Sequence, residues 1–478
     1  MKVFKNWFSI LLSIKIERSF NKLIKSSPDL FLSISRKKLI KTVNHVLKHS
    51  SLYKKIASDG LKSVSVKNEQ EFKERIPIID KEVLFNNNSL KELTTGISFE
   101  KIGTIRISSG SSGSYSYQVQ PTEKKFVDGL ITEYLLKMLF NVPVDNSVIV
   151  NTLPAGFNIP TFKVPVVITG TIEKHSYVTI KKIVHDFKHI VLTGEAPFIK
   201  KVLENGIEDG FSWKDHDVYI ITGGEYVAEN MRSYFSSLLG SESPEEGRVK
   251  INMGLTELAT TVFFETVETI KIRRLAQSNE QFRSRFLGDN IKSIPEVMHY
   301  MPHELYMESI TNTEGRPELV ITLLGKKHHI PVIRYNTKDE VKLINYNELC
   351  SILIDCGLEK YQPKFKLPLG IIYGRGKRMS DGNDWFTVNE IKEVIYEDFG
   401  IANKITGAFK IFDKINDRFV VKIQLKDKVE GVEGMIDKIS EIAEKYTKCR
   451  IDFALIPYNK FRYGMEFNYG RKFNYYNI

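Results

Sequence analysis

Short apolar runs alternate with helical stretches along much of this chain, and that alternation restricts its fold more than any other feature. The runs that read as buried strands are 147–150, 164–168, 189–192 and 218–221. The last of them is followed by Thr222, Gly223 and Gly224, and then by a helical stretch over 226–239. Strands, glycine-containing turns and helices in regular succession predict an α/β fold built on a sheet.

The length of the chain predicts more than one domain. At 478 residues it is too long for a single hydrophobic core. We place a boundary after the turn-rich passage 369–376, so that a large domain covers 61–376 and a small domain covers 377–478. The small domain is predicted to hold strands, a helix and a further strand at 409–412, 418–425, 432–448 and 451–456. This pattern is typical of a small α+β unit.

Positive charge is concentrated in a basic helical lead-in over residues 1–60. This segment holds thirteen Lys or Arg and three Asp or Glu, and so carries nearly all of the net charge of +11. The nearly neutral remainder argues against nucleic-acid binding, which needs a broad basic groove. Near the N-terminus one helical face carries Phe4, Trp7, Phe8, Leu11 and Leu12. That face predicts either weak contact with a membrane surface or packing on its own domain.

The chain is expected to be cytoplasmic. Its best apolar run, 7–14, is far shorter than the roughly 20 residues of a membrane span, and no signal-peptide cleavage site follows it. The three cysteines form no CxxC pair, and none of the ten histidines completes a metal-binding spacing. A disulfide framework and a thiolate or histidine metal centre are therefore not expected.

A Ser/Gly-rich loop is the clearest local signal of chemistry. It follows a predicted strand at 104–107 and reads Ser108, Ser109, Gly110, Ser111, Ser112 and Gly113. Glycine lets backbone amides approach phosphate oxygens, and hydroxyl groups add donors, so this loop could hold phosphate. It lacks the lysine of a GxxxxGK[ST] loop, and a Ser/Gly segment can also be a plain connection.

The loop and four later segments together resemble the adenylate-forming superfamily of acyl-CoA synthetases, and most closely its phenylacetate-CoA ligase branch. Ser116 stands where many members carry Lys in the phosphate loop. The segment 221–225, with Gly223, Gly224 and Glu225, is similar to the turn that lies along adenine in that family. A strand-to-helix turn without ligand is the alternative for this segment.

Two further segments extend the resemblance. The segment 252–257 is similar to YGxTE, which implies that Thr256 contacts the α-phosphate and that Glu257 helps to hold Mg²⁺. Met253, before Gly254, replaces the aromatic residue that stacks on adenine. The segment 331–339 matches PVIRYxTxD, which implies that Asp339 binds the ribose hydroxyls.

The last two segments lie at the hinge and in the tail. Residues 373–378 resemble the hinge motif, which implies that Arg375 contacts ribose or phosphate and that Lys377 lies at the pivot of the small domain. The family also uses a late lysine that bonds the acyl carboxylate and the α-phosphate. Lys472 is the candidate for this role, with Lys460 as the alternative.

The resemblance implies an enzyme with a large α/β domain and a small mobile α+β domain. It would activate a carboxylic acid with ATP and Mg²⁺ and pass the acyl group to a thiol, that of coenzyme A or of a carrier protein. An amine acceptor, a non-catalytic nucleotide-binding relative and a peripheral membrane or nucleic-acid binder are the alternatives. The acyl pocket is expected within 151–224, where Phe157, Phe162 and Trp213 could be its walls or simply core residues.

Overall fold

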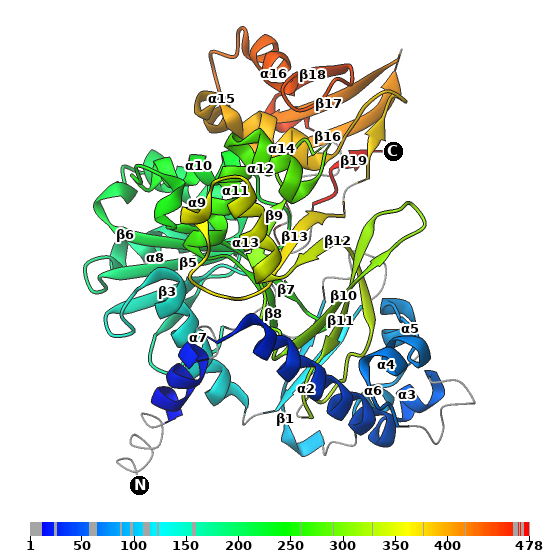
Figure 1. Ribbon diagram of the computed structural model, residues 1–478. Helices are drawn as coiled ribbons and strands as arrows, with labels where there is room; N and C mark the ends of the chain where they lie inside the picture. Colours follow the sequence, from blue (N-terminus) through cyan, green and yellow to red (C-terminus); the bar gives the residue numbers. More distant parts are fainter. Residues whose placement is uncertain are drawn as a thin grey trace.

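The computed structural model describes residues 12–22, 26–56, 65–86, 88–95, 99–108, 115–121, 124–154, 159–258, 260–289, 291–326, 328–375, 377–415, 417–461, 467, 469 and 473–477. The protein has the predicted α/β class, with a large mixed sheet, helices around it, and a smaller sheet at one end of the molecule (Figure 1). Within those residues, no helix is both long enough and apolar enough to cross a membrane.

One half of the large sheet is parallel. Its strands, in spatial order, are β4 (Val166–Ile168), β3 (Ser147–Asn151), β5 (His189–Glu195), β6 (Asp217–Gly223) and β7 (Val249–Leu255). The helices between them are α8 (Glu173–Ile183), α9 (Ala196–Glu208) and α10 (Glu229–Leu238). The strands β3, β4, β5 and β6 match the predicted runs, whereas β7 was not predicted. Because parallel strands end at the same edge of a sheet, the turns after β6 and β7 lie next to each other.

The other half of the sheet is antiparallel. From β7 outward its strands are β8 (Thr260–Phe264), β9 (Glu296–His299), β13 (Leu369–Gly374), β12 (Tyr335–Ile344), β11 (Pro317–Leu323) and β10 (Leu305–Thr311). Its helices are α11 (Val267–Ser278), α12 (Glu280–Leu287) and α13 (Tyr346–Asp355).

The predicted turn at 369–376 is wrong for most of its length, because β13 is a strand paired on both sides. In the sequence, Gly370 is typical of a turn. A Cβ at Gly370 would lie 2.4 Å from the ring of Phe263, so this glycine is needed for close packing and not for a turn. The chain leaves the large sheet after Gly374.

Helices cover the N-terminal part of the chain. They are a helix over 12–22 and then α2 (Pro28–His49), α3 (Ser51–Ile56), α4 (Glu69–Arg75), α5 (Lys81–Phe85) and α6 (Leu90–Leu93). Arg334 attaches them to the sheet, because its buried guanidinium donates to the carbonyls of Lys73 and Ile76 at 2.6 Å each. Ile79 also pairs with Tyr335 as an isolated bridge. The arginine of the PVIRY segment is therefore structural.

A two-stranded hairpin precedes the large sheet in sequence. It consists of β1 (Ile102–Ile107) and β2 (Tyr117–Pro121), and α7 (Lys124–Phe140) follows it. The Ser/Gly-rich loop connects the two strands of this hairpin.

The C-terminal part forms the smaller sheet. Its order is β18 (Ile451–Ile456), β17 (Arg418–Leu425), β16 (Ile405–Ile415) and β19 (Tyr476–Asn477). It is accompanied by β14 (Met379–Ser380), β15 (Trp385–Phe386), α14 (Val388–Glu397), α15 (Phe399–Lys404) and α16 (Met435–Ala443). The helix predicted over 432–448 is shorter, because the left-handed Gly434 precedes α16 and turns follow it.

Buried polar contacts join this C-terminal part to the large sheet. The carboxylate of Glu393 on α14 accepts from the backbone amides of Glu229 and Asn230, at 2.9 and 3.1 Å, at the start of α10. Lys200 on α9 donates to the carbonyl of Ile405 at 2.7 Å. A carboxylate at a helix N-terminus satisfies amides that have no partner within the helix.

Candidate active site

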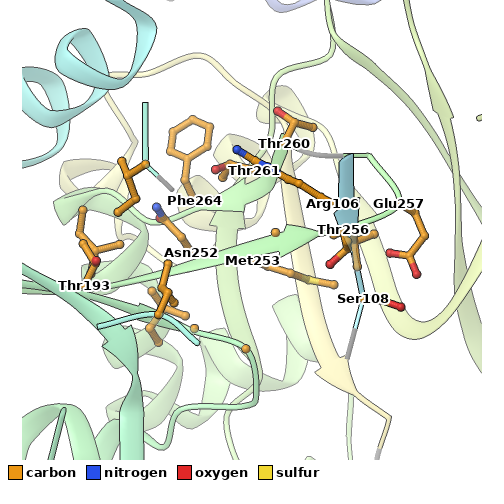
Figure 2. Close-up of a pocket in the computed structure, with 18 of the residues that line it drawn as sticks. Arg106, Ser108, Thr193, Asn252, Met253, Thr256, Glu257, Thr260, Thr261 and Phe264 are labelled. Atoms are coloured by element: carbon orange, nitrogen blue, oxygen red, sulfur yellow. The ribbon is translucent and has the colours of Figure 1, made fainter. Parts of the chain in front are cut away.

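A cavity of about 2490 Å³ lies at the edge of the sheet where β6 and β7 end. Ten of the residues selected from the sequence line it: Ser108, Gly223, Gly224, Glu225, Met253, Gly254, Thr256, Glu257, Asp339 and Arg375. They come from five separate segments of the chain. In Figure 2, Ser108, Thr256 and Glu257 lie on one side of the view, while Thr193, Asn252 and Phe264 lie on the other.

Six of the selected residues lie outside the part of the chain that the structure describes. They are Ser109, Gly110, Ser111, Ser112, Gly113 and Lys472. Phe473, the residue after Lys472, lines the cavity.

The base of the Ser/Gly-rich loop is fixed by two serines. The amide of Ser108 donates to the carbonyl of Ser116 at 3.0 Å, and the amide of Ser116 donates to Oγ of Ser108 at 2.9 Å. Ser116 is fully buried and does not line the cavity. The side chain of Ser116 therefore offers no group to a ligand in this cavity.

Lys81, in the first turn of α5, supplies a cation at this point, and no pattern in the sequence indicates this role. Its Nζ donates to Oγ of Ser108 at 3.2 Å and lies 3.6 Å from Oε1 of Glu257. The carboxylate of Asp80 caps α5 by accepting from the amides of Glu82 and Val83. The cap fixes the helix start, and Lys81 lines the cavity beside the loop.

Glu257 is held from two sides. Gln118 on β2 donates to the backbone carbonyl of Glu257 at 2.7 Å. Burial raises the pKa of Tyr335 well above its usual value, and the neighbouring Glu257 carboxylate adds to the shift. A protonated tyrosine beside Glu257 keeps a donor available to that carboxylate.

Asp339 and Arg375 form a bidentate ion pair in the cavity wall. Nε of Arg375 lies 2.6 Å from Oδ1 of Asp339, and Nη2 lies 3.3 Å from Oδ2. Nη2 also donates to the carbonyl of Thr337 at 2.5 Å. Burial disfavours the charge on Arg375, but the charge and hydrogen bond of Asp339, together with Tyr335 and Glu257, act in the opposite direction and raise the pKa of the guanidinium. Asp339 lies inside β12 and not after a strand, following a left-handed Lys338 with φ of 62°.

The turn after β6 needs its two glycines. A Cβ on Gly223 would lie 2.0 Å from the carbonyl oxygen of Asn252, and Gly224 has φ of +94°. Glu225 then joins three segments, because its Oε1 lies 3.1 Å from Nζ of Lys392 and accepts from the hydroxyl of Tyr475 at 3.1 Å. The backbone of this turn faces the cavity, while the Glu225 carboxylate is engaged by protein partners.

Lys377 and Lys460 do not line the cavity. Lys377 is exposed, and its carbonyl accepts from the hydroxyl of Tyr476 at 2.7 Å. Lys460 is exposed in a short 3₁₀ helix after β18. Neither lysine is therefore placed to contact a ligand in the arrangement described.

Of the aromatic residues proposed for the acyl pocket, one lines the cavity and another belongs to the core. Phe162 lines the cavity, and Phe157 lies outside the described residues. Trp213 is a core residue, because its ring is buried and its Nε1 donates to the carbonyl of Leu203 at 2.8 Å. A buried indole with a satisfied donor is a packing element.

Arg106 is a second cation that the sequence reading missed. It lies on β1, two residues before Ser108, and its side chain extends toward Thr260 and Thr261 of β8 (Figure 2). Burial lowers the pKa of Arg106, and the Asp128 carboxylate acts in the opposite direction. Arg106 and Asp128 both line the cavity.

Comparison with solved structures identifies the architecture. 2-Hydroxyisobutyryl-CoA ligase in its postadenylation state aligns with a TM-score of 0.67 at 12% identity, over 93% of this chain and 88% of the ligase. The chain has the fold of this coenzyme A ligase. A second complex, with 2-HIB-AMP, gives 0.65 at 13% identity over 90% and 86% of the two chains. The same ligase in the thioester-forming state, with coenzyme A, gives 0.55 at 12% identity over 95% and 90%. No family model matches the chain, and no curated protein matches it.

Proposed function

We propose that this protein activates a carboxylic acid by ATP-dependent adenylation and then transfers the acyl group to a thiol, in the simplest case that of coenzyme A. The observation that carries the proposal is the convergence of ten selected residues from five segments on one cavity. A carboxylate is a poor acyl donor because its oxygen is a poor leaving group. Attachment of AMP to that oxygen makes it part of a good leaving group.

The nucleotide is assigned to the end of the cavity that holds the β6 turn and Asp339. The backbone of Gly223 and Gly224 faces the space in which an adenine ring would lie, and Met253 offers a polarizable apolar contact to it. Asp339 would accept hydrogen bonds from the ribose hydroxyls, with Arg375 holding its carboxylate in place. A carboxylate fixed by a bidentate pair loses little freedom on binding.

The chemical step takes place at the α-phosphorus. A carboxylate oxygen of the acid forms a bond to this phosphorus, the bond to the bridging oxygen breaks, and pyrophosphate leaves with the electron pair. The protein must stabilise negative charge on the phosphate oxygens, which Ser108, Thr256 and Lys81 would do by hydrogen bonds and charge. Lys472 is proposed as the cation that bonds the acyl carboxylate and the α-phosphate.

The donor set at Glu257 fits Mg²⁺ bound mainly by phosphates. Among the residues that the structure describes, no group of three or more His, Cys, Asp or Glu side chains could hold a metal ion. Mg²⁺ commonly takes one or two carboxylates and completes its shell with water and substrate phosphates. Glu257 would be that carboxylate, and the ion would neutralise charge on the phosphates.

The second step requires a thiol and a change in the position of the small domain. We propose that 61–376 is the AMP-binding domain and 377–478 the mobile domain, with Lys377 at the pivot. The chain aligns better with the postadenylation state of 2-hydroxyisobutyryl-CoA ligase than with its thioester-forming state, with TM-scores of 0.67 and 0.55. This difference supports an arrangement of the two parts that precedes the entry of coenzyme A.

The finer assignment is to the phenylacetate-CoA ligase branch, and it rests on the PVIRYNTKD and SSGSSG segments. An acyl adenylase that loads a carrier protein is the alternative, since it would use the same adenylation residues. A protein that binds nucleotide without catalysis is a second alternative, favoured by Met253 in place of an aromatic residue.

ATP–pyrophosphate exchange with purified protein and a panel of acids tests the proposal. Exchange should require both an acid and Mg²⁺. Asp339→Asn should lower it sharply, whereas Asp209→Asn, on an exposed residue that does not line the cavity, should not. Thioester formation with coenzyme A then separates the ligase from the carrier-loading enzyme. ATP binding without exchange for any acid would support the non-catalytic alternative.

A further inference from the structure

The cavity extends past the proposed nucleotide end along one face of α7. Val127, Ile131, Leu135 and Leu139 all line it, and they follow one another at intervals of four residues. Side chains four residues apart lie on the same face of an α-helix. At 1.5 Å per residue, the stripe from the first to the last of them is about 18 Å long. The side of the cavity formed by α7 is therefore an elongated apolar strip.

The large sheet contributes further apolar side chains to the cavity. Ile149 of β3, Val166 of β4, Val191 of β5 and Phe264 of β8 line the same cavity. Ile131 and Leu135 are only partly buried, although both side chains are apolar. Apolar surface that borders an open space gains stability when an apolar ligand fills that space.

Two residues on another face of α7 fix this helix to the 161–164 segment. Oε1 of the buried Glu133 accepts from the backbone amides of Phe162 and Val164, at 2.8 Å each. A Cβ at Gly129 would lie 2.7 Å from the carbonyl carbon of Thr161, so only glycine allows the two segments to approach so closely. Glu133 and Gly129 thus fix α7 to the 161–164 segment on the side of the helix away from the stripe, so that the stripe is held in place where it lines the cavity.

The groove has charge at one end. Asp128 follows Val127 at the N-terminal end of α7, and it interacts with Arg106 of β1. Arg106 lies two residues before Ser108, so this charged end of the groove adjoins the proposed phosphate site. From there the strip runs away from the phosphates, through Ile131 and Leu135 toward Leu139. A cation at one end of a long apolar groove complements an acid with a long apolar chain.

We infer that the acid is an unbranched alkanoic acid, whose carboxylate lies near Arg106 and whose chain extends along the α7 stripe toward Leu139. This inference rests on the proposed function and deepens it by naming the substrate class. Each methylene that enters the groove should improve activation roughly fourfold until the groove is full. A small hydroxy acid or a compact aryl acid would leave most of the groove empty.

The test is adenylate formation with straight-chain acids from butyrate to palmitate, measured in the wild type, Ile131→Trp, Leu135→Trp and Leu135→Ala. The wild type should prefer long acids. Both Trp variants should shorten the preferred chain, and Ile131→Trp should shorten it more because residue 131 lies nearer the carboxylate end. Leu135→Ala should favour longer acids, and it tests the groove even if a Trp variant fails to fold. Ile354→Trp, on the exposed face of α13, is the matched control and should behave as the wild type.

The outcomes distinguish the inference from the function on which it rests. In the Trp variants, kcat/KM should fall about tenfold or more for palmitate and remain nearly unchanged for butyrate, because only the long chain meets the new ring. The inference is wrong if the wild type activates only short or compact aryl acids, or if the Trp variants lower kcat/KM equally for all acids. The proposed adenylation stands in either case. If no acid supports exchange, the proposed function fails and the inference with it.

Discussion

The ammonium group of Lys81 lies 3.6 Å from the carboxylate of Glu257 and 3.2 Å from the hydroxyl of Ser108. These three residues come from α5, from the turn between β7 and β8, and from the end of β1. The structure thus places a lysine beside the Ser/Gly-rich loop even though Ser116, within the loop's own sequence, is buried away from the cavity. A cation contributed by another segment can serve the same electrostatic purpose.

Lys81→Ala should lower the rate of acid-dependent pyrophosphate exchange by about tenfold to a hundredfold, because one positive charge near the phosphates is lost. Lys81→Arg should retain part of the rate. The measurement is exchange at saturating ATP and acid. Lys55→Ala is the control, since Lys55 is exposed and pairs only with Glu92. An unchanged rate in Lys81→Ala would remove Lys81 from the proposed phosphate site.

Asp339→Asn should raise the KM for ATP about tenfold or more, since the carboxylate that would bind the ribose loses its charge and its bidentate partner. Arg375→Lys should raise it less. Expressed as free energies of ATP binding, the combined effect of the two changes should be smaller than the sum of their separate effects, because both act through one ion pair. Fully additive effects in this double-mutant cycle would mean that Asp339 and Arg375 act independently.

Gly223→Ala should destabilise the protein by several kcal/mol or prevent folding, because the new methyl group would lie 2.0 Å from the carbonyl oxygen of Asn252. Gly170→Ala is the matched control. Gly170 has φ of +58° with no atom within 4 Å of an added Cβ, so its substitution should cost only about 1–2 kcal/mol. Urea unfolding of both variants measures the difference, and equal costs would contradict the close approach of β6 and β7.

We expect the buried Lys200 to make the free energy of unfolding depend on pH. Burial lowers its pKa from 10.5 to about 8, although Glu204 opposes the shift. Between these two values the folded lysine has lost its proton and the unfolded lysine has kept it. The unfolded state therefore binds more protons, and the contribution of Lys200 to the free energy of unfolding rises with pH across this window, by at most about 1.4 kcal/mol per pH unit.

Thermal unfolding of the wild type and Lys200→Met near pH 7.5 and near pH 9.5 measures this contribution. The stability of the wild type relative to the variant should increase at the higher pH. Glu204 keeps Lys426 at 2.9 Å and the hydroxyl of Tyr234 at 2.6 Å in the variant, so its carboxylate is not left without partners. The same difference at both pH values would show that Lys200 keeps its proton throughout.

The fold class and most strands could be predicted because they depend on local patterns. The runs at β3 and β5 are buried on both faces of a parallel sheet, which produces continuous apolar sequence. β13 was missed because Gly370 resembles a turn residue until the ring of Phe263 is placed against it. Helix ends were predicted less well, as at α16, because turns and caps set them.

The residues of the candidate site also fall into two groups, those selected from the sequence and those found only in the structure. Ser108, Thr256, Glu257 and Asp339 were selected because each lies in a segment whose order of residues is itself distinctive. Lys81 and Arg106 were not, because a single lysine or arginine in a short helix or strand is usually a solvated charge. The role of Lys81 and Arg106 in the site depends on which other segments lie beside them.

The sequence by itself therefore determined the α/β class and most strands of the parallel half of the sheet, since these follow from side-chain periodicity. The tertiary structure alone decided that Lys81 faces Ser108, that Trp213 belongs to the core, and that the stripe on α7 lines a long groove. Contacts between distant segments are set by how the elements pack, and one chain segment carries no record of its neighbours in space.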